Sequence, residues 1–398
     1  MTPTTPPAVS APPSATPRGG DAERPDRPCV TELRLSAFAV HRGTVLRLAP
    51  LTLLAGPSGS GKTSALRAYE ALARLGAGAE LGAVFPDPGA CVPERARPDA
   101  QRRRGFRIGC TADGPEGPVR LDLAVQAEPD LRIVGERLTA DGMVLLETAL
   151  RDPGRRAVQA AWHTAGPSPV TRAPLPDDRL GTALLPLRVA GKTDGQRRVL
   201  AAAEQMLVAL RSVFACDPRP GRMRHPVPIG SGRLLGGCDN IADVLGRTRA
   251  ECGRRYARFV AAARAGCAGP VADVLAEPVA GGAVGALLDR GGGIRTGLAR
   301  LGDGELRYLA LALVLLTGPG VLEVDAAGEV PAALQTLTVV ADGLDRGLDA
   351  RQRAELLRLA AEMCERGHVR LVGAVGEATW SAGPAGARVV HLGRDTRV

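Results

Sequence analysis

The segment GPSGSGKT, Gly56–Thr63, constrains the fold of this chain more than any other part of its sequence. It fits the pattern G-x-x-x-x-G-K-[ST] and lies between an apolar run, TVLRLAPLTLLAG, and a segment with helical spacing, GKTSALRAYEALARLG. Glycines let the backbone turn so that successive N–H groups face phosphate oxygens, and the N-terminus of the following helix adds its dipole. The pattern predicts a strand that ends at Gly56, a phosphate-binding loop, and a helix that ends at Gly76.

Individual residues of this loop have predicted roles. Lys62 is expected to reach the β and γ phosphates of a nucleotide, and the Thr63 hydroxyl is expected to bind Mg²⁺. The predicted nucleotide-binding residues are Gly56, Pro57, Ser58, Gly59, Ser60, Gly61, Lys62, Thr63 and Ser64. The tripeptide GKT recurs at Gly191–Thr193, but Pro186 replaces the first glycine of the pattern and no strand precedes it. We assign no function to this second match.

A loop of this kind needs a second acid on the magnesium side, at the end of another strand of the same sheet. The segment LTVVAD, Leu337–Asp342, is the strand-like run in the C-terminal half that ends in a carboxylate and precedes a helix. We therefore expect Thr63 and Asp342 to bind Mg²⁺ together. The alternative is that Asp342 is a turn residue at the end of a strand.

Sequence patterns divide the chain into three parts. Residues 1–28 are rich in Pro, Ala, Ser and Thr and are expected to be a disordered tail. Residues 29–76 and 295–398 are expected to form an α/β nucleotide-binding core with a mixed or parallel sheet, and residues 77–294 an insertion. In the insertion, VRLDLAV, LRIVGERL and GMVLLETAL predict antiparallel strands, while Asp194–Phe214 and Asn240–Ala265 predict helices.

Composition excludes several classes of protein. The net charge of +9 comes almost wholly from arginine, because Lys62 and Lys192 are the only lysines, and we attribute it to a GC-rich genome rather than to nucleic-acid binding. The eight cysteines form no Cys-x-x-Cys pair, so neither a zinc site nor a disulfide framework is indicated. The longest apolar run, Leu309–Leu316, is about half of the ~18 residues that a membrane helix needs. We read no signal peptide and expect a cytoplasmic protein without a membrane partner.

Two further segments resemble a known family. LGDGELRYLALALVLL, Leu301–Leu316, is similar to the signature motif and following helix of the ABC-type P-loop ATPases, in the RecF, OLD and SMC-like branch that is often described as AAA-family ATP-binding proteins. DGLDRGLD, Asp342–Asp349, resembles the Walker B motif and D-loop of that family. Gly304 lies on the second glycine of the signature, and Arg307 stands where this branch usually has a basic residue. The order of the motifs along the chain also matches.

The resemblance implies a dimer that holds ATP and Mg²⁺ between two chains. In such a dimer the signature residues of one copy cap the γ-phosphate that the phosphate-binding loop of the other copy holds. By this resemblance the signature residues are Gly302, Asp303, Gly304 and Glu305, and the D-loop residue that faces the partner is Asp349. The fold implied is an ABC-type head with an antiparallel β section and a helical insertion between the phosphate-binding loop and the signature.

Three positions depart from the family pattern. The residue after Asp342 is Gly343 instead of the catalytic glutamate, Gly302 replaces the signature serine, and Val372–Trp380 lacks the switch histidine. A positioned general base contributes about 10²- to 10⁴-fold to a rate, so these losses predict slow hydrolysis or none. Asp345 or Glu377 would have to replace the missing base.

Two main hypotheses follow. The chain is either a slow ATPase that dimerises on ATP or an ATP-dependent switch or scaffold that does not hydrolyse ATP; a P-loop kinase would leave the signature-like segment without an explanation. DNA and an effector protein are candidate partners. The segments Arg95–Arg107, with Arg102, Arg103 and Arg104, and Arg247–Arg258 would contact DNA, although exposed loop and helix faces explain them equally well. The five histidines form no cluster by spacing, and we assign them no catalytic role.

Overall fold

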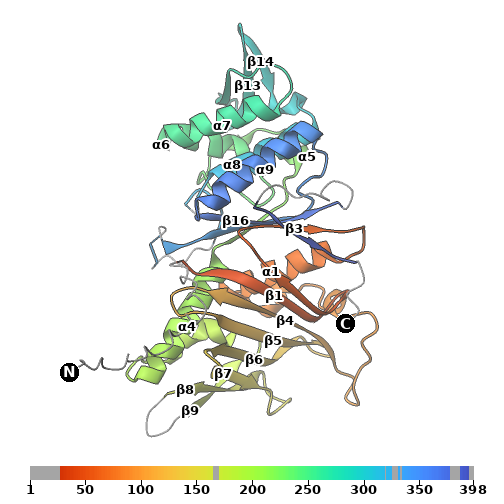
Figure 1. Ribbon diagram of the computed structural model, residues 1–398, viewed down its shortest axis with the longest axis vertical. Helices are drawn as coiled ribbons and strands as arrows, with labels where there is room; N and C mark the ends of the chain where they lie inside the picture. The colour runs from red at the N-terminus through yellow and green to blue at the C-terminus, as the bar shows by residue number, and fades with distance from the viewer. Residues whose placement is uncertain are drawn as a thin grey trace, which may run out of the picture.

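The structure, a computed structural model, describes most of the chain outside its N-terminal tail. The described residues are 27–164, 170–318, 320–324, 330–331, 334–376 and 386–393. The predicted disordered segment, residues 1–28, lies almost wholly outside them. An antiparallel sheet and a parallel sheet form separate layers of the molecule (Figure 1).

The antiparallel sheet comes mainly from the middle of the chain. In spatial order its strands are β2 (His41–Arg47), β1 (Cys29–Phe38), β4 (Arg104–Asp113), β5 (Val119–Glu128), β6 (Arg132–Ala140), β7 (Met143–Ala149), β8 (Ala157–His163) and β9 (Val170–Pro176). The strands predicted from VRLDLAV, LRIVGERL and GMVLLETAL coincide with β5, β6 and β7. In β5, Leu121, Leu123 and Val125 are buried, whereas Arg120 is exposed on the other face, so this strand follows the alternation of its sequence.

The parallel sheet carries the strand that precedes the phosphate-binding loop. In spatial order its strands are β10 (Val213–Cys216), β15 (Leu337–Ala341), β16 (Val369–Val375), β3 (Leu51–Ala55) and β17 (Arg388–His391). Strands β3, β15 and β16 are buried along their whole length and are continuous apolar runs, because both faces of the sheet are covered. Alternate residues enter different cores: Leu54 and Val340 belong to one hydrophobic cluster, and Leu53 and Val339 belong to the other.

Helices cover both faces of the parallel sheet. The α-helices of the described residues are α1 (Lys62–Gly76), α2 (Leu81–Val84), α3 (Gly181–Arg188), α4 (Asp194–Arg211), α5 (Pro220–Met223), α6 (Ile241–Glu251), α7 (Gly253–Gly266), α8 (Asp303–Leu316) and α9 (Ala350–Glu365). Helices α7, α8 and α9 lie on one side of this sheet, and α1 lies on the other side, against the antiparallel sheet (Figure 1). A small sheet lies beyond α7, at the top of Figure 1. Its strands are β11 (Val227–Pro228), β12 (Asp273–Val279), β13 (Ala283–Gly291) and β14 (Ile294–Gly297).

The predicted helix at residues 194–214 is shorter than expected. It ends at Arg211, and Val213 begins strand β10, which pairs in parallel with β15. The prediction was wrong at this end because VFAC contains apolar residues that fit a buried strand as well as a helix, and β15 provides an edge for pairing. Strand β10 thus brings part of the predicted insertion into the parallel sheet. The division of the chain at residues 76 and 294 stays a prediction.

The second predicted helix, residues 240–265, is divided into α6 and α7. The break is at Cys252, whose φ and ψ are −147° and 85°. Gly253 follows directly, and glycine costs about 1 kcal/mol relative to alanine inside a helix. The continuous helical spacing of this segment therefore hid this break, and glycine alone does not explain it, because Gly246 lies inside α6.

Candidate nucleotide-binding site

The phosphate-binding loop of residues 56–63 joins the end of β3 to the start of α1. Gly59 and Gly61 have φ of 80° and 92°, a left-handed conformation that favours glycine. At Gly61 an added Cβ atom would lie 2.6 Å from both the His41 Nε2 atom and the Val40 Cγ2 atom. The backbone path and the close packing leave no room for a side chain at residue 61.

Lys62 is the first residue of α1, and its side chain folds over the loop. The Nζ group donates hydrogen bonds to the carbonyl oxygens of Gly56 (2.5 Å) and Pro57 (2.8 Å). These are the contacts of an ammonium that lies where phosphate oxygens would approach the loop. Phosphate oxygens are stronger acceptors than carbonyl oxygens and would replace them around Nζ.

The structure brings Thr63 and Asp342 together across 279 residues of sequence. The Thr63 Oγ1 hydroxyl donates a hydrogen bond of 2.9 Å to the Asp342 Oδ2 atom. Thr63 lies in the first turn of α1, and Asp342 follows the end of β15. A hydroxyl and a carboxylate are oxygen ligands of the kind that Mg²⁺ takes when waters and nucleotide phosphates complete its coordination. The two predicted metal ligands therefore fit Mg²⁺ as donors.

Arg307 connects this corner to the neighbouring strand. Its guanidinium is 4% exposed and lies between the ends of β10 and β15. The Nη1 atom donates to Asp217 Oδ1 (3.2 Å) and to the Pro218 carbonyl (2.7 Å). The Nη2 atom donates to the carbonyls of Asp342 (3.3 Å) and Gly343 (3.0 Å). Because Arg307 belongs to α8, the signature-like segment is tied to the Asp342 turn within one chain.

The signature-like segment begins helix α8. Gly302 is its N-cap residue and is exposed, as is Asp303. The carboxylate of Asp303 accepts a hydrogen bond of 2.6 Å from Arg224, and the Glu305 carboxylate accepts one of 2.9 Å from the Ala268 N–H. Both acids thus have partners in their own chain, while the helix N-terminus remains at the surface.

Gly304 packs closely against the turn that follows β15. An added Cβ atom would lie 2.2 Å from the Gly347 carbonyl oxygen, which belongs to the turn between β15 and α9.

We expect Gly304→Ala to lower the free energy of unfolding by about 1–3 kcal/mol, because the backbone would have to move. Gly302→Ser is the matched control: no atom lies within 4 Å of the Cβ position of Gly302. Serine is also a better N-cap than glycine, so chemical denaturation should show this variant at least as stable as the wild type. Equal stability of the two variants would contradict the packing argument.

The turn from Asp342 to Asp349 has a defined conformation. Gly343 has φ of 59°, and an added Cβ atom would lie 2.8 Å from the Arg346 guanidinium. The Asp349 side chain caps helix α9 by accepting a hydrogen bond of 2.7 Å from the Gln352 N–H. The position predicted to face a dimer partner is therefore used within its own chain as a helix cap.

Asp345, one of the two residues expected to replace the missing base, is held by a contact with the backbone. The Asp345 Oδ2 atom accepts a hydrogen bond of 3.0 Å from the Gly376 N–H, which fixes the turn to the end of β16. Glu377 lies outside the described residues. In this structure the Asp345 carboxylate therefore stabilises the turn that follows β15.

His41 is a neighbour of the loop that sequence spacing did not reveal. The side chain is 4% exposed, its Nε2 atom lies 2.9 Å from the Gly61 carbonyl oxygen, and its Nδ1 atom lies 3.2 Å from Thr44 Oγ1. Burial lowers the pKa of this imidazole below its ordinary value, and the hydrogen bond to Gly61 opposes the shift. The contact depends on the hairpin of β1 and β2 packing against the loop, which no local pattern predicts.

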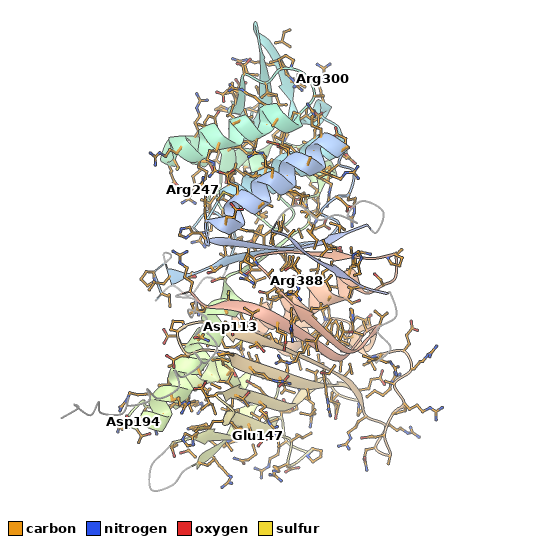
Figure 2. All side chains as sticks on the ribbon, in the orientation of Figure 1. Asp113, Glu147, Asp194, Arg247, Arg300 and Arg388 are labelled. Carbon is orange, nitrogen blue, oxygen red and sulfur yellow. The ribbon has the colours of Figure 1, made fainter. Side chains whose placement is uncertain are left out.

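The two arginine-rich segments lie on opposite sides of the parallel sheet. Arg247 is on the α7 side, and the segment at residues 95–107 leads into β4 of the antiparallel sheet (Figure 2). Several of these arginines have acidic partners: Arg103 with Asp99 at 2.8 Å and Arg104 with Glu128 at 2.5 Å. The structure does not bring these segments into one continuous basic surface.

Among the described residues, no helix is long and apolar enough to cross a membrane. In the same parts of the chain, no group of three or more His, Cys, Asp or Glu side chains is placed to hold a metal ion. Thr63 and Asp342 do not form such a group, because they are only two residues and only Asp342 is one of these four types.

Comparisons with known proteins give structural neighbours only. No family model matches the chain, and no curated protein matches it. Similar solved structures include an SMC head bound to the C-winged helix domain of ScpA (11% identity, TM-score 0.48, 87% of this chain and 90% of that chain). An SMC head domain from Thermotoga maritima aligns at 13% identity and TM-score 0.39, over 87% of this chain and 89% of that one. A head with an extended coiled coil, bound to the C-terminal domain of ScpA derived from Pyrococcus furiosus, aligns at 10% identity and TM-score 0.46, over the same shares.

Proposed function

We propose that this chain binds Mg·ATP at the loop of residues 56–63 and hydrolyses it slowly. The observation that carries the proposal is the 2.9 Å hydrogen bond between Thr63 and Asp342. It joins a phosphate-binding loop to an acid at the end of a parallel strand, which is the arrangement that places Mg²⁺ against the nucleotide phosphates. Lys62 supplies the positive charge for the β and γ phosphates, and the glycine-rich backbone supplies N–H donors.

The same proposal includes an ATP-dependent homodimer. The N-terminus of α8, at Gly302, is at the surface, and the acids at residues 303 and 305 have partners in their own chain. This arrangement would let the backbone N–H groups of α8 approach the γ-phosphate held by a second copy. The family resemblance of residues 301–316 supports this geometry.

The test measures affinity, turnover and mass on one sample. ATP affinity is measured by calorimetry, phosphate release in steady state, and molar mass by light scattering with and without saturating Mg·ATP. Tight binding, slow phosphate release and a doubled mass are expected. A protein that binds Mg·ATP and stays monomeric would count against the sandwich, and one that binds no ATP would contradict the whole proposal.

A second function, an ATP-dependent switch or scaffold without hydrolysis, is favoured by one observation. The residue beside Asp342 is a glycine with a left-handed backbone, so it has no carboxylate to activate water. In that case ATP binding and dimerisation would persist while phosphate release equals that of the Lys62→Ala variant. The measurement of turnover separates the two functions.

A further inference from the structure

A cavity lies directly beside Thr63 and Asp342, the pair proposed to bind Mg²⁺. It has a volume of about 580 Å³, and its lining includes Thr63 and Asp342 together with Asp217, Arg219 and Glu70. The space is therefore continuous with the place where Mg²⁺ and the γ-phosphate are proposed to bind. A water molecule that attacks the γ-phosphate from this side would stand in the same cavity.

Strand register places Asp217 next to Asp342. Strand β10 pairs in parallel with β15, and Cys216 is paired with Ala341. The next residues along the two strands are Asp217 and Asp342, at the same edge of the sheet. Neighbouring strands are about 4.8 Å apart, so the two acids leave the sheet side by side.

The contacts of Asp217 hold one of its oxygens and leave the other open. The Oδ1 atom accepts the 3.2 Å hydrogen bond from buried Arg307 and lies 3.8 Å from Arg346. Within the described part of the chain, no hydrogen bond reaches the Oδ2 atom, and the side chain is 56% exposed. A carboxylate anchored through one oxygen has a fixed direction and can still accept a proton on the other.

The other carboxylates that line the cavity are less suited to take a proton from water beside Asp342. Asp239 pairs with Arg222 at 3.4 Å. Glu70 lies on α1 about two turns after Thr63, and Glu323 is exposed and lies outside the strands of the parallel sheet. None of these three is anchored beside Asp342 by strand pairing.

We propose that Asp217 is the general base for the slow hydrolysis of ATP. It takes the place of the glutamate expected at position 343, where this chain has Gly343. This inference rests on the proposed function. Asp217 takes one proton from a water molecule while the water oxygen bonds to the γ-phosphorus. The bond between the γ-phosphorus and the bridging oxygen breaks, ADP leaves, and the proton passes from Asp217 to solvent.

The experiment compares Asp217→Asn with the wild type in the full chain. Asparagine keeps an oxygen acceptor for Arg307 but cannot take a proton at neutral pH. We expect phosphate release to fall at least 100-fold, while the Kd of Mg·ATP changes less than threefold. Asp217→Glu should recover part of the rate.

Asp239→Asn is the matched control, because it removes a carboxylate from the lining of the same cavity; its turnover should stay within twofold of the wild type. Turnover of Asp217→Asn within twofold of the wild type overturns the inference and leaves the proposed function intact. Wild-type turnover no higher than that of Lys62→Ala, with ATP bound, also overturns it and leaves ATP binding intact. Absence of ATP binding in the wild type overturns both.

Discussion

Replacement of Lys62 by alanine is expected to raise the Kd of Mg·ATP by about 100-fold, which corresponds to about 2.7 kcal/mol. The reason is the position of the ammonium over the loop, within 2.8 Å of the Gly56 and Pro57 carbonyl oxygens. Alanine leaves the backbone N–H donors in place but removes the only side-chain cation of the motif. Calorimetric titration with Mg·ATP measures the loss directly.

Lys192→Ala is the control for this change. Lys192 is the only other lysine of the chain, it stands in the second GKT, and it is exposed. In that tripeptide Thr193 caps helix α4 by accepting a hydrogen bond from the Gln196 N–H, so the segment has a structural role. We expect Lys192→Ala to bind Mg·ATP as the wild type does. Equal affinity of the Lys62 and Lys192 variants would contradict the assignment of the site.

Replacement of Arg307 by alanine is expected to lower the free energy of unfolding by about 1–3 kcal/mol. The guanidinium is buried and donates to Asp217 and to the carbonyls of Pro218, Asp342 and Gly343. Alanine leaves these acceptors without their donor and opens a space between β10, β15 and α8. Denaturant titration followed by circular dichroism measures the change.

Arg346→Ala is the matched control for Arg307. Arg346 lies 3.8 Å from the same Asp217 oxygen, but its side chain is 58% exposed. An exposed ion pair of this kind contributes about 0–1 kcal/mol, so the Arg346 variant should be nearly as stable as the wild type. Arg307→Lys should recover little, because an ammonium has its three donors on one nitrogen and lacks the guanidinium fork that spans the two strand ends. Similar losses for the Arg307 and Arg346 variants would disprove the role of Arg307 as the link between the strands.

Local patterns account for much of the fold. The helix predicted after the phosphate-binding loop coincides with α1, and alternation in VRLDLAV coincides with β5. The errors lie where tertiary contacts overrule local preference. Val213–Cys216 forms a strand because it pairs with the edge of β15. Cys252 interrupts a segment whose helical spacing predicted one continuous helix.

The candidate site shows the same limit. Its two halves, the loop with Lys62 and Thr63 and the strand end with Asp342, are predictable because each has a pattern of its own. Asp217 and His41 have none. Asp217 follows a strand whose partner is more than a hundred residues away, and His41 reaches the loop through the packing of a hairpin. The departure at Gly343 was visible in the sequence, but the φ of 59° there was not.

By itself, the sequence determined that a glycine-rich loop with Lys62 and Thr63 would join a buried strand to a helix. Spacing and residue type along one stretch of chain decide that arrangement, because its hydrogen bonds and backbone angles are local. The sequence also led us to expect that Asp342 would meet Thr63, but only the tertiary structure decided that Asp217 would stand beside Asp342. Strand order in a sheet depends on which distant segments bury their apolar faces together, and that choice is made by the whole chain.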